Sequence, residues 1–496
     1  MKQLSLYING LACEGRSGRY ADGFDPAEGT VTRSVPLAGP MEIDGALAAA
    51  SMAFPDWSAM PPQQRARVLA EFQGLLQQHQ DELAELIVRE HGKVLAEAVD
   101  EVARGIEAVA HACDIAGRLD TRRVASAESG IDNWRVRAPL GIVLGITPSS
   151  LPLLAPCAQF ALALACGNVF ILKPSQRTPS AALRVGHLLR QAGLPDGAFN
   201  VLFGDKQAID TLIAHRDIAA VSFIGSTPVA QEVHTEATRH GKRVQALGSA
   251  KHHIVVMPDA DLDRAADALM AGAFGSASLR GMANAIAVAV GDIGDALAER
   301  LAPRVRALAI GHGLSPGAQM GPLPTPQHRL SVMRYIEDGE ASGATLRVDG
   351  RGLSVPGHER GFFLGATLFD HVAPRMNIYR EEIYGPVLNI LRVPDLAAAI
   401  ALVNAHESAN AASCFTADGG TALAFGRQVR TGLAGINVPV PAARTWHAFG
   451  GWTGALPGDA QPPGEDAIRF HTTDKSIMQR WPGDAPPAHD IGETPC

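Results

Sequence analysis

Several features that mark particular classes of protein are scarce or missing in this sequence. Six cysteines among 496 residues are too few for a disulfide scaffold and are typical of a reducing compartment. The formal net charge is −8 and no basic run occurs, so no nucleic-acid partner is predicted. Neither an HExxH motif nor a paired Cys/His spacing is present, which predicts no metal site. Only 7 of the 43 basic residues are lysine, a bias typical of a GC-rich genome.

Long apolar segments that could meet a membrane are also missing. Residues 1–15 have no apolar core of signal-peptide length, and Asn9-Gly10 between short apolar runs predicts a hairpin turn. Residues 138–172 carry no charge, but four prolines and a Gly-Asn pair interrupt them. A strand at 141–146, a helix at 153–166 and a strand at 169–173 explain this stretch better than a membrane helix. We therefore expect a cytoplasmic protein that makes no membrane contact.

The length and the hydrophobic periodicity predict an α/β protein of two or three domains. Apolar residues recur at helical spacing in four segments, at 43–54, 62–79, 81–92 and 94–119. Between 141 and 256, strand-like segments alternate with helix-length ones, as a doubly wound parallel sheet requires. This alternation resumes over 260–440. The segments IRFHTT (468–473) and SIMQRW (476–481) are predicted as late strands, and the proline-rich tail after them as disordered.

One turn between a predicted strand and a predicted helix is suited to a phosphate. The strand ends at Gly225, and Ser226 and Thr227 lead into a helix with Pro228 in its first turn. Backbone N–H groups at such a helix start can bind an anion. The motif is not GxGxxG, and by itself an ordinary strand–helix turn explains it equally well.

Four segments that occur in a fixed order indicate a protein family more specifically than any one of them does alone. ITPSSLPLL (146–154), ILKPSQRTP (171–179), SFIGSTP (222–228) and REEIYGPVL (380–388) together resemble the aldehyde dehydrogenase superfamily. The sequence is most similar to its CoA-acylating methylmalonate-semialdehyde dehydrogenases, over nearly the whole chain. The resemblance implies two doubly wound parallel-sheet domains and a small β oligomerisation flap, in a homodimer or homotetramer. The implied bounds are 1–119 and 141–250 for an NAD-binding domain, 251–445 for a catalytic-type domain, 120–140 and 467–482 for the flap, and 483–496 for a flexible tail.

The resemblance also implies NAD as the cofactor. Lys173 stands where family members hold the adenine-ribose hydroxyls, and Ser175 follows in the same motif. Gln176 stands where a glutamate often assists with that ribose. An amide can still accept a hydrogen bond from a hydroxyl, so we expect NAD binding to be weakened but retained.

Further cofactor positions follow from the same comparison with the family. Gly225 and Ser226 occupy the turn that would contact the pyrophosphate. Glu382 matches the acid that binds the nicotinamide ribose, and Tyr384 stands at the neighbouring aromatic position. Tyr384 could instead be a core residue, but the acidic pair just before it favours a site.

The nucleophile of the family is absent from its expected position. Family members use a cysteine thiolate that adds to the aldehyde, and the resulting thioester is released to water or CoA. The family pattern resembles GSAGERCMA, and it aligns without a gap on GSASLRGMA (275–283). Gly281 stands at the cysteine position, Leu279 replaces an acidic or amide residue, and Ser150 stands at the position of the oxyanion-binding asparagine. The acylating reaction is therefore predicted to be absent or vestigial.

Three further positions indicate the branch of the family and its substrate. Ala246 stands where hydrolytic members carry a general-base glutamate, as in CoA-acylating members, for which water activation would waste the thioester. Arg104 and Arg280 match the two arginines that hold the substrate carboxylate in methylmalonate-semialdehyde dehydrogenases. Guanidinium groups pair well with carboxylates, so an acidic small molecule or aldehyde is the expected ligand.

The remaining cysteines do not offer a substitute nucleophile. Cys157, on the predicted helix after the oxyanion turn, is expected to be inert packing. Three hypotheses follow: a pseudoenzyme that binds nucleotide or an acidic ligand, an oxidoreductase with thiol-independent chemistry, and a structural or regulatory subunit of an oligomer. The retained Lys173, Glu382, Arg104 and Arg280 argue against a purely structural role.

Overall fold

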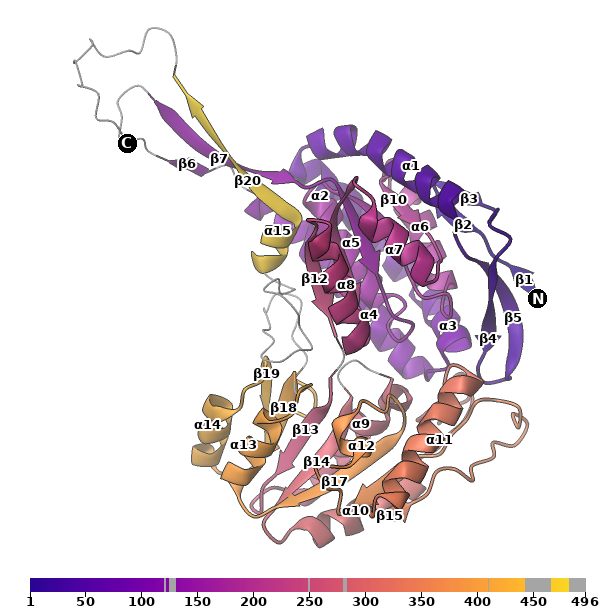
Figure 1. Ribbon diagram of the computed structural model, residues 1–496, viewed down its shortest axis with the longest axis vertical. Helices are drawn as coiled ribbons and strands as arrows, with labels where there is room; N and C mark the ends of the chain where they lie inside the picture. Colours follow the sequence, from indigo (N-terminus) through magenta and orange to yellow (C-terminus); the bar gives the residue numbers. More distant parts are fainter. Residues whose placement is uncertain are drawn as a thin grey trace, which may run out of the picture.

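The computed structural model describes residues 1–119, 122–124, 131–248, 250–279, 283–408, 410–441 and 465–480. Two bodies, each built on a seven-stranded sheet covered by helices, lie one above the other in Figure 1. A narrow three-stranded ribbon projects away from both. The predicted α/β class with parallel sheets and a small β extension is confirmed.

The first sheet has the strand order β12-β11-β8-β9-β10-β2-β3. Its parallel strands β8 to β11 are nearly all buried, which explains why the sequence reads there as almost unbroken apolar runs. The bounds are β2 Leu6–Ile8, β3 Leu11–Cys13, β8 Ile142–Ile146, β9 Val169–Lys173, β10 Phe199–Val201, β11 Ile218–Ile224 and β12 Arg243–Leu247.

The helices of this body agree with the predicted ones to within a few residues. The helix predicted at 94–119 is shorter and ends in one 3₁₀ turn, Ala116–Arg118. The helices are α1 Pro40–Ala59, α2 Pro62–Gln78, α3 Gln80–His91, α4 Leu95–Ile115, α5 Leu154–Ala165, α6 Ser180–Gln191, α7 Lys206–Ala214 and α8 Thr227–Arg239. The uncharged stretch 138–172 is thus a buried strand–helix–strand unit. Among the residues that the model describes, no helix is long and apolar enough to cross a membrane.

The second sheet has the order β15-β16-β17-β14-β13-β18-β19. It is parallel except for the antiparallel edge pair β15 and β16. Its strands are β13 His252–Val256, β14 Asn284–Val290, β15 Thr345–Val348, β16 Thr367–Asp370, β17 Val387–Val393, β18 Ala411–Phe415 and β19 Leu433–Ile436. Its helices are α9 Leu262–Phe274, α10 Gly294–Arg306, α11 Pro326–Ala341, α12 Asn377–Arg380, α13 Leu396–Asn404 and α14 Gly419–Gln428.

The two ends of the chain add small sheets. The predicted Asn9-Gly10 hairpin joins β2 to β3, and both turn residues have positive φ, 52° and 75°, as a type I′ turn requires. Near it, β1 Lys2–Gln3, β5 Thr30–Pro36 and β4 Tyr20–Asp25 form a separate sheet that the sequence analysis did not predict. The projecting ribbon contains β6 Arg122–Val124, β7 Asp132–Pro139 and β20 Thr472–Gln479.

One predicted strand is wrong. The segment IRFHTT lies largely in helix α15, Glu465–His471, and only its last residues begin β20. The Arg243 guanidinium donates to the backbone carbonyls of Arg469, Phe470 and Thr472. These bonds satisfy carbonyls that the end of a helix leaves free, so a partner distant in sequence stabilises the helix. Residues 454–466, which are rich in proline, glycine and aspartate, are expected to form a loop; 454–464 lie outside the described residues, whereas 465 and 466 begin α15. The proline-rich tail also lies outside the described residues.

Candidate functional site

Three strand ends of the first sheet bring the predicted cofactor residues to one edge. The register pairs Ile146 of β8 with Lys173 of β9 and with Phe223 of β11, so these parallel strands end level with one another. The loops after them therefore emerge side by side at the carboxyl edge, the usual ligand-binding edge of an open α/β sheet. Ser150 lies in the loop after β8, Ser175 and Gln176 in the loop after β9, and Gly225 and Ser226 after β11.

Lys173 is a largely buried lysine at the end of β9. Its side chain ends β9 and is only 8% exposed. Within the described part of the chain, no hydrogen bond to its Nζ is recorded. Burial lowers the pKa of Lys173 to about 8, and the nearby Asp205 opposes part of that shift. A largely buried ammonium is costly to keep charged, so a ligand that brings hydroxyl oxygens would stabilise it at this position.

The rest of the edge is polar and accessible. The Ser175 hydroxyl accepts a hydrogen bond from the backbone N–H of Arg177 at 3.2 Å, and Gln176 beside it is half-buried. Ser226 is exposed at the N-cap of α8, and its hydroxyl does not cap the helix. A Cβ at Gly225 would lie 2.5 Å from the Phe223 ring, so a larger residue here would have to displace that ring.

A buried ion pair holds the loop that contains Ser150. The Lys93 amine, before α4, lies 2.5 Å from Glu101 Oε2 on α4 and donates to the Ser150 carbonyl at 3.0 Å. Glu101 Oε1 accepts from the backbone N–H groups of Leu153 and Leu154 at 2.9 and 3.3 Å. Both charged side chains are 3% exposed. The position of the Ser150 loop is therefore set by α4, not only by β8.

The second sheet contributes Tyr384, which reaches Ser150. Tyr384 lies before β17 with φ of +57°, and its phenol lies close enough to the Ser150 side chain for Ser150 to influence the phenol pKa. Its backbone carbonyl is 2.7 Å from Nε2 of His328 on α11, and the two rings stack at 6.1 Å. Burial raises the pKa of the phenol to about 12, and the charge of Glu382 raises it further, while Ser150 opposes the rise. Ser150 and Tyr384 thus meet between the two bodies.

Lys251 anchors the loop that precedes Tyr384. Its fully buried amine donates to the carbonyls of Ile378 at 2.8 Å and Glu381 at 2.6 Å. Burial lowers the pKa of Lys251 to about 7, opposed by the charges of Glu382 and Glu381. Because those charges reach Lys251, the Glu382 carboxylate lies near both this amine and the Tyr384 phenol.

The segment before the expected nucleophile position is strained and is held by Glu97. Ser276, Ala277 and Ser278 all have φ between 49° and 63°, a left-handed conformation that non-glycine residues rarely adopt. The carboxylate of Glu97, on the first turn of α4, accepts from the Ser276 N–H at 2.7 Å and from its hydroxyl at 2.9 Å. Leu279 after them is buried. The predicted positions Arg280 and Gly281 lie outside the described residues.

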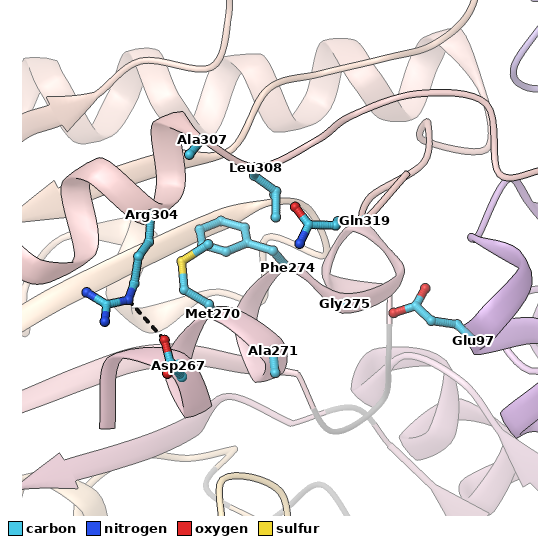
Figure 2. A pocket seen from close by; sticks show the side chains of 10 residues that line it. All are labelled: Glu97, Asp267, Met270, Ala271, Phe274, Gly275, Arg304, Ala307, Leu308 and Gln319. Carbon is cyan, nitrogen blue, oxygen red and sulfur yellow. Dashed lines mark hydrogen bonds and ion pairs between the residues drawn. The ribbon is translucent and has the colours of Figure 1, made fainter. Parts of the chain in front are cut away.

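A separate pocket lies behind this segment. Figure 2 shows Glu97 of α4 at one end and the Arg304–Asp267 ion pair at the other, with Phe274 and Met270 between them. Its volume is about 540 Å³. None of the predicted cofactor residues lines it, so the pocket is distinct from the edge that carries Lys173 and Ser150.

Two other predicted residues have contrasting surroundings. Ala246 is 2% exposed within β12, paired with Phe223, and brings no proton acceptor. Arg104 is exposed on α4, and no ion pair of its side chain is recorded in the described residues. The next residue, Gly105, packs on the Ser150 loop: a Cβ there would lie 3.5 Å from Leu153. Arg104 therefore lies on the helix that supports the loop.

Four of the five described cysteines are poor nucleophiles. Cys157 is fully buried on α5, and burial raises the pKa of its thiol far above the usual range. Burial likewise raises the pKa of Cys166 and of Cys414 to about 12 and that of Cys113 to about 11. A thiol needs an accessible thiolate to attack a carbonyl. None of these four side chains meets that condition, as expected for Cys157. Among the described residues, no His/Cys/Asp/Glu group could hold a metal ion.

Sequence reasoning missed the residues that position the site. Lys93, Glu101, Lys251 and His328 belong to no motif, and their roles follow from contacts between distant segments. One signal was present: the chain has only seven lysines, and three of them, the third being Lys173, are buried. In a chain with so few lysines, a lysine inside an apolar segment predicts a buried cation.

The whole chain matches known proteins. Residues 13–477 match the model of the aldehyde dehydrogenase family. A malonate-semialdehyde dehydrogenase of Pseudomonas aeruginosa is 48% identical over 467 residues, 94% of each chain. The solved methylmalonate-semialdehyde dehydrogenase of Oceanimonas doudoroffii superposes with a TM-score of 0.95 at 45% identity, covering 97% of this chain and 99% of its own. A second solved structure, from Sinorhizobium meliloti, is described as a putative methylmalonate-semialdehyde dehydrogenase complexed with NAD. It superposes with a TM-score of 0.96 at 43% identity, and the match covers 97% of this chain and 99% of its own. The chain belongs to the aldehyde dehydrogenase family.

Proposed function

We propose that this protein binds NAD and a small acidic aldehyde but does not perform thioester-forming oxidation. Gly281 of the sequence, at the position aligned with the nucleophilic cysteine, carries the proposal, because glycine has no side chain. Cys113, Cys157, Cys166 and Cys414 are buried or partly buried thiols with raised pKa values, so none replaces it. Loss of a nucleophile costs about 10⁶ in kcat in a well-studied protease, or about 8 kcal/mol.

The nucleotide is supported by the residues at the sheet edge. Lys173 offers a buried amine to ribose hydroxyls, and the Thr147 hydroxyl near it is buried without a partner in the described residues. Glu382 offers a carboxylate, and the start of α8 after Ser226 offers backbone N–H groups. The NAD-bound relative supports the same assignment. When bound, NAD supplies hydride acceptance, and NADH supplies hydride donation.

Descent from the CoA-acylating branch explains Ala246. This buried position has no group that could activate water, so a thioester formed in an ancestor would have been kept for CoA. The relatives named for malonate and methylmalonate semialdehyde support this branch. If Gly281 leaves no thioester to be released, CoA has no acyl group to accept from this protein.

The acidic substrate class rests on two arginines. Arg104 projects from α4 without an ion pair among the described residues, and Arg280 is retained in the sequence beside Gly281. A guanidinium that is free of protein carboxylates can bind the carboxylate of a small ligand. We propose a short semialdehyde carboxylic acid as the ligand, in a homodimer or homotetramer whose contacts involve the projecting ribbon.

The deciding experiment restores the missing groups. Wild-type protein should give no CoA-dependent NADH formation with malonate or methylmalonate semialdehyde, measured at 340 nm against a boiled control. Gly281→Cys combined with Ser150→Asn should recover activity if the remaining pocket is preserved. Wild-type activity above the control would overturn the proposal. NADH titrated into the wild type should give a saturable fluorescence change, and none up to millimolar cofactor would contradict nucleotide binding.

One observation favours a second function, an oxidoreductase with thiol-independent chemistry. Ser150, at the position aligned with the oxyanion site, and Tyr384 both carry hydroxyls, and the two side chains lie close enough for Ser150 to influence the phenol pKa. Such a pair can bind and protonate an oxygen without a covalent intermediate.

A further inference from the structure

We propose that the pocket shown in Figure 2 binds a small organic cation, a primary ammonium group carried on a short apolar body. Glu97, one face of α9, the end of α10 and Gln319 line this pocket. The inference goes beyond the proposed function and does not depend on it, because none of the described residues assigned to the nucleotide or the aldehyde lines the pocket. It adds a second ligand site, next to the segment that leads to position 281.

The pocket lies where the two bodies of the molecule meet. Its volume of about 540 Å³ is within the usual range for small-molecule sites. One wall is a single face of α9, because Asp267, Met270, Ala271 and Phe274 follow the i, i+3, i+4 and i+7 spacing of a helix face. The end of α10 and the segment after it form a second wall, and Glu97 of α4 lies at one end (Figure 2). Segments from both bodies therefore frame one space that is large enough for a ligand.

The middle of the pocket is apolar. Phe274 and Met270 lie between the two charged ends in Figure 2, with Leu308 above them in the same view. Phe274 is buried in the core of the second body, which fixes the position of its ring. A thioether and an aromatic ring are polarisable surfaces that pack well on the carbon atoms of a ligand, and an aromatic face also attracts a cation. The body of the ligand is therefore expected to be apolar.

The Arg304 end of the pocket offers little to an anion. The Arg304 Nε donates to Asp267 at 2.9 Å, Nη2 donates to Asp263 at 2.8 Å, and Nη1 donates to the Arg300 carbonyl at 2.9 Å. Arg300 itself lies 3.7 Å from Asp263, so two carboxylates and two guanidinium groups balance one another here. Each nitrogen of Arg304 already donates to the protein. With Glu97 at the other end, the residues that line the pocket carry two carboxylates and one guanidinium, which favours a cation.

The opposite end presents a carboxylate in a fixed orientation. Glu97 accepts hydrogen bonds from the Ser276 N–H at 2.7 Å and from the Ser276 hydroxyl at 2.9 Å, and its carboxylate points toward Gly275 in Figure 2. A carboxylate has about four acceptor sites, so an ammonium group can bind it together with Ser276. Hydrogen bonds between an ammonium and a carboxylate are stronger than those between neutral groups. The charged group of the ligand is therefore expected at Glu97.

The ligand site is connected to the strained segment that precedes position 281. Glu97 both lines the pocket and holds Ser276, and Phe274 and Gly275 lead directly into three residues with positive φ. A ligand that binds the folded state stabilises the contacts that form its site. An ammonium group bound to Glu97 would thus stabilise the conformation of residues 276–278 as well. Hydrogen exchange of the backbone in this segment should slow when the ligand binds.

The first test compares ligands of similar size and different charge. Phenylethylammonium, phenylethanol and phenylacetate are each titrated into the full-length protein without nucleotide, and binding is measured by calorimetry. We expect saturable binding of the ammonium, binding of the alcohol that is weaker by about tenfold or more, and still weaker binding of the carboxylate, because the charge-assisted hydrogen bond is lost and then replaced by repulsion. Equal binding of all three, or no saturable binding of the ammonium at millimolar concentration, would overturn the proposal.

The second test removes the charge of Glu97. Glu97→Gln keeps an acceptor for Ser276 and should bind phenylethylammonium about ten- to hundredfold more weakly, with the affinity for phenylethanol unchanged. Glu107→Gln, at an exposed position of α4 outside the pocket, is the matched control and should leave both affinities unchanged. An equal loss for both ligands in Glu97→Gln would show that this side chain only supports the structure, and an unchanged affinity for the ammonium would remove it from the site.

The third test locates the ligand. Ala271→Phe fills the pocket from an exposed position on α9 and should abolish binding of the ammonium, whereas Ala401→Phe, exposed on α13, should bind it as the wild type does. In the wild type, the ammonium should slow deuterium exchange over 267–279 and 304–319 and leave 180–191 unchanged. Unchanged binding in Ala271→Phe, or protection only elsewhere, would overturn the site. NADH enters none of these measurements, so their failure would leave the proposed function standing.

Discussion

Lys93 and Lys173 are both buried in the first body, but only one of them has partners. The Lys93 amine contacts the Glu101 carboxylate and the Ser150 carbonyl. Lys173, at the end of β9, has no hydrogen bond to its amine in the described structure, and burial lowers its pKa. The paired lysine holds the Ser150 loop. Lys173, when charged, lowers the stability of the fold, as expected for a group that is retained to bind a ligand.

Removing Lys93 should have the largest effect. Lys93→Met leaves the Glu101 carboxylate buried without its counter-charge, and breaking a buried pair in this way costs about 3–5 kcal/mol. Urea unfolding followed by circular dichroism measures the change. Lys206→Met, at an exposed lysine, is the matched control and should stay within about 0.5 kcal/mol of wild type. A loss below about 1 kcal/mol for Lys93→Met would remove the structural role assigned to the pair.

Removing Lys173 should change the free energy of unfolding in the opposite direction and make the protein more stable. The pKa of this lysine falls from 10.5 unfolded to about 8 folded, so the unfolded chain binds more protons between these values. Wild-type stability should therefore rise with pH across this interval. Lys173→Met should be more stable than wild type by up to about 3 kcal/mol below pH 8, and the difference should shrink toward pH 10.5.

Nucleotide binding tests the same variant independently. Lys173→Met should bind NADH at least tenfold more weakly, measured by fluorescence titration, because the ribose hydroxyls lose their amine partner. A variant that is less stable than wild type at pH 7, with unchanged NADH affinity, would make Lys173 a structural residue like Lys93.

Lys251 is hydrogen bonded to backbone carbonyls, and its removal should have the smallest effect on stability. Its amine donates to two backbone carbonyls, and Lys251→Met would leave both without that donor. We expect a loss of about 1–3 kcal/mol, measured by the same urea unfolding. Because burial lowers the pKa of Lys251 from 10.5 to about 7, the unfolded chain binds more protons between these values, so the loss should grow as the pH rises from about 7 toward 10.5. A loss as large as that of Lys93→Met would show that hydrogen bonds to carbonyls are worth as much here as an ion pair.

Local patterns predicted the elements that are stabilised locally or buried on both faces. The uncharged stretch 138–172 could be assigned because strands and a helix of fitting length alternate with turns. The Asn9-Gly10 hairpin could be assigned because both residues tolerate positive φ. The helix at Glu465–His471 was predicted as a strand, because the Arg243 guanidinium that binds its carbonyls comes from a distant strand. No window of sequence contains that partner.

The candidate site likewise has some features that the sequence determines and others that depend on the tertiary structure. Its family and the absence of a side chain at Gly281 follow from the sequence alone, because motif order and residue identity need no third dimension. The proximity of Ser150 to Tyr384, the ion pair of Lys93 with Glu101, and the burial of Lys173 were decided only by the tertiary structure. A side chain's partners and its burial depend on segments that meet only when the two sheets fold against their helices, and these determine which hydroxyl or amine is left for a ligand.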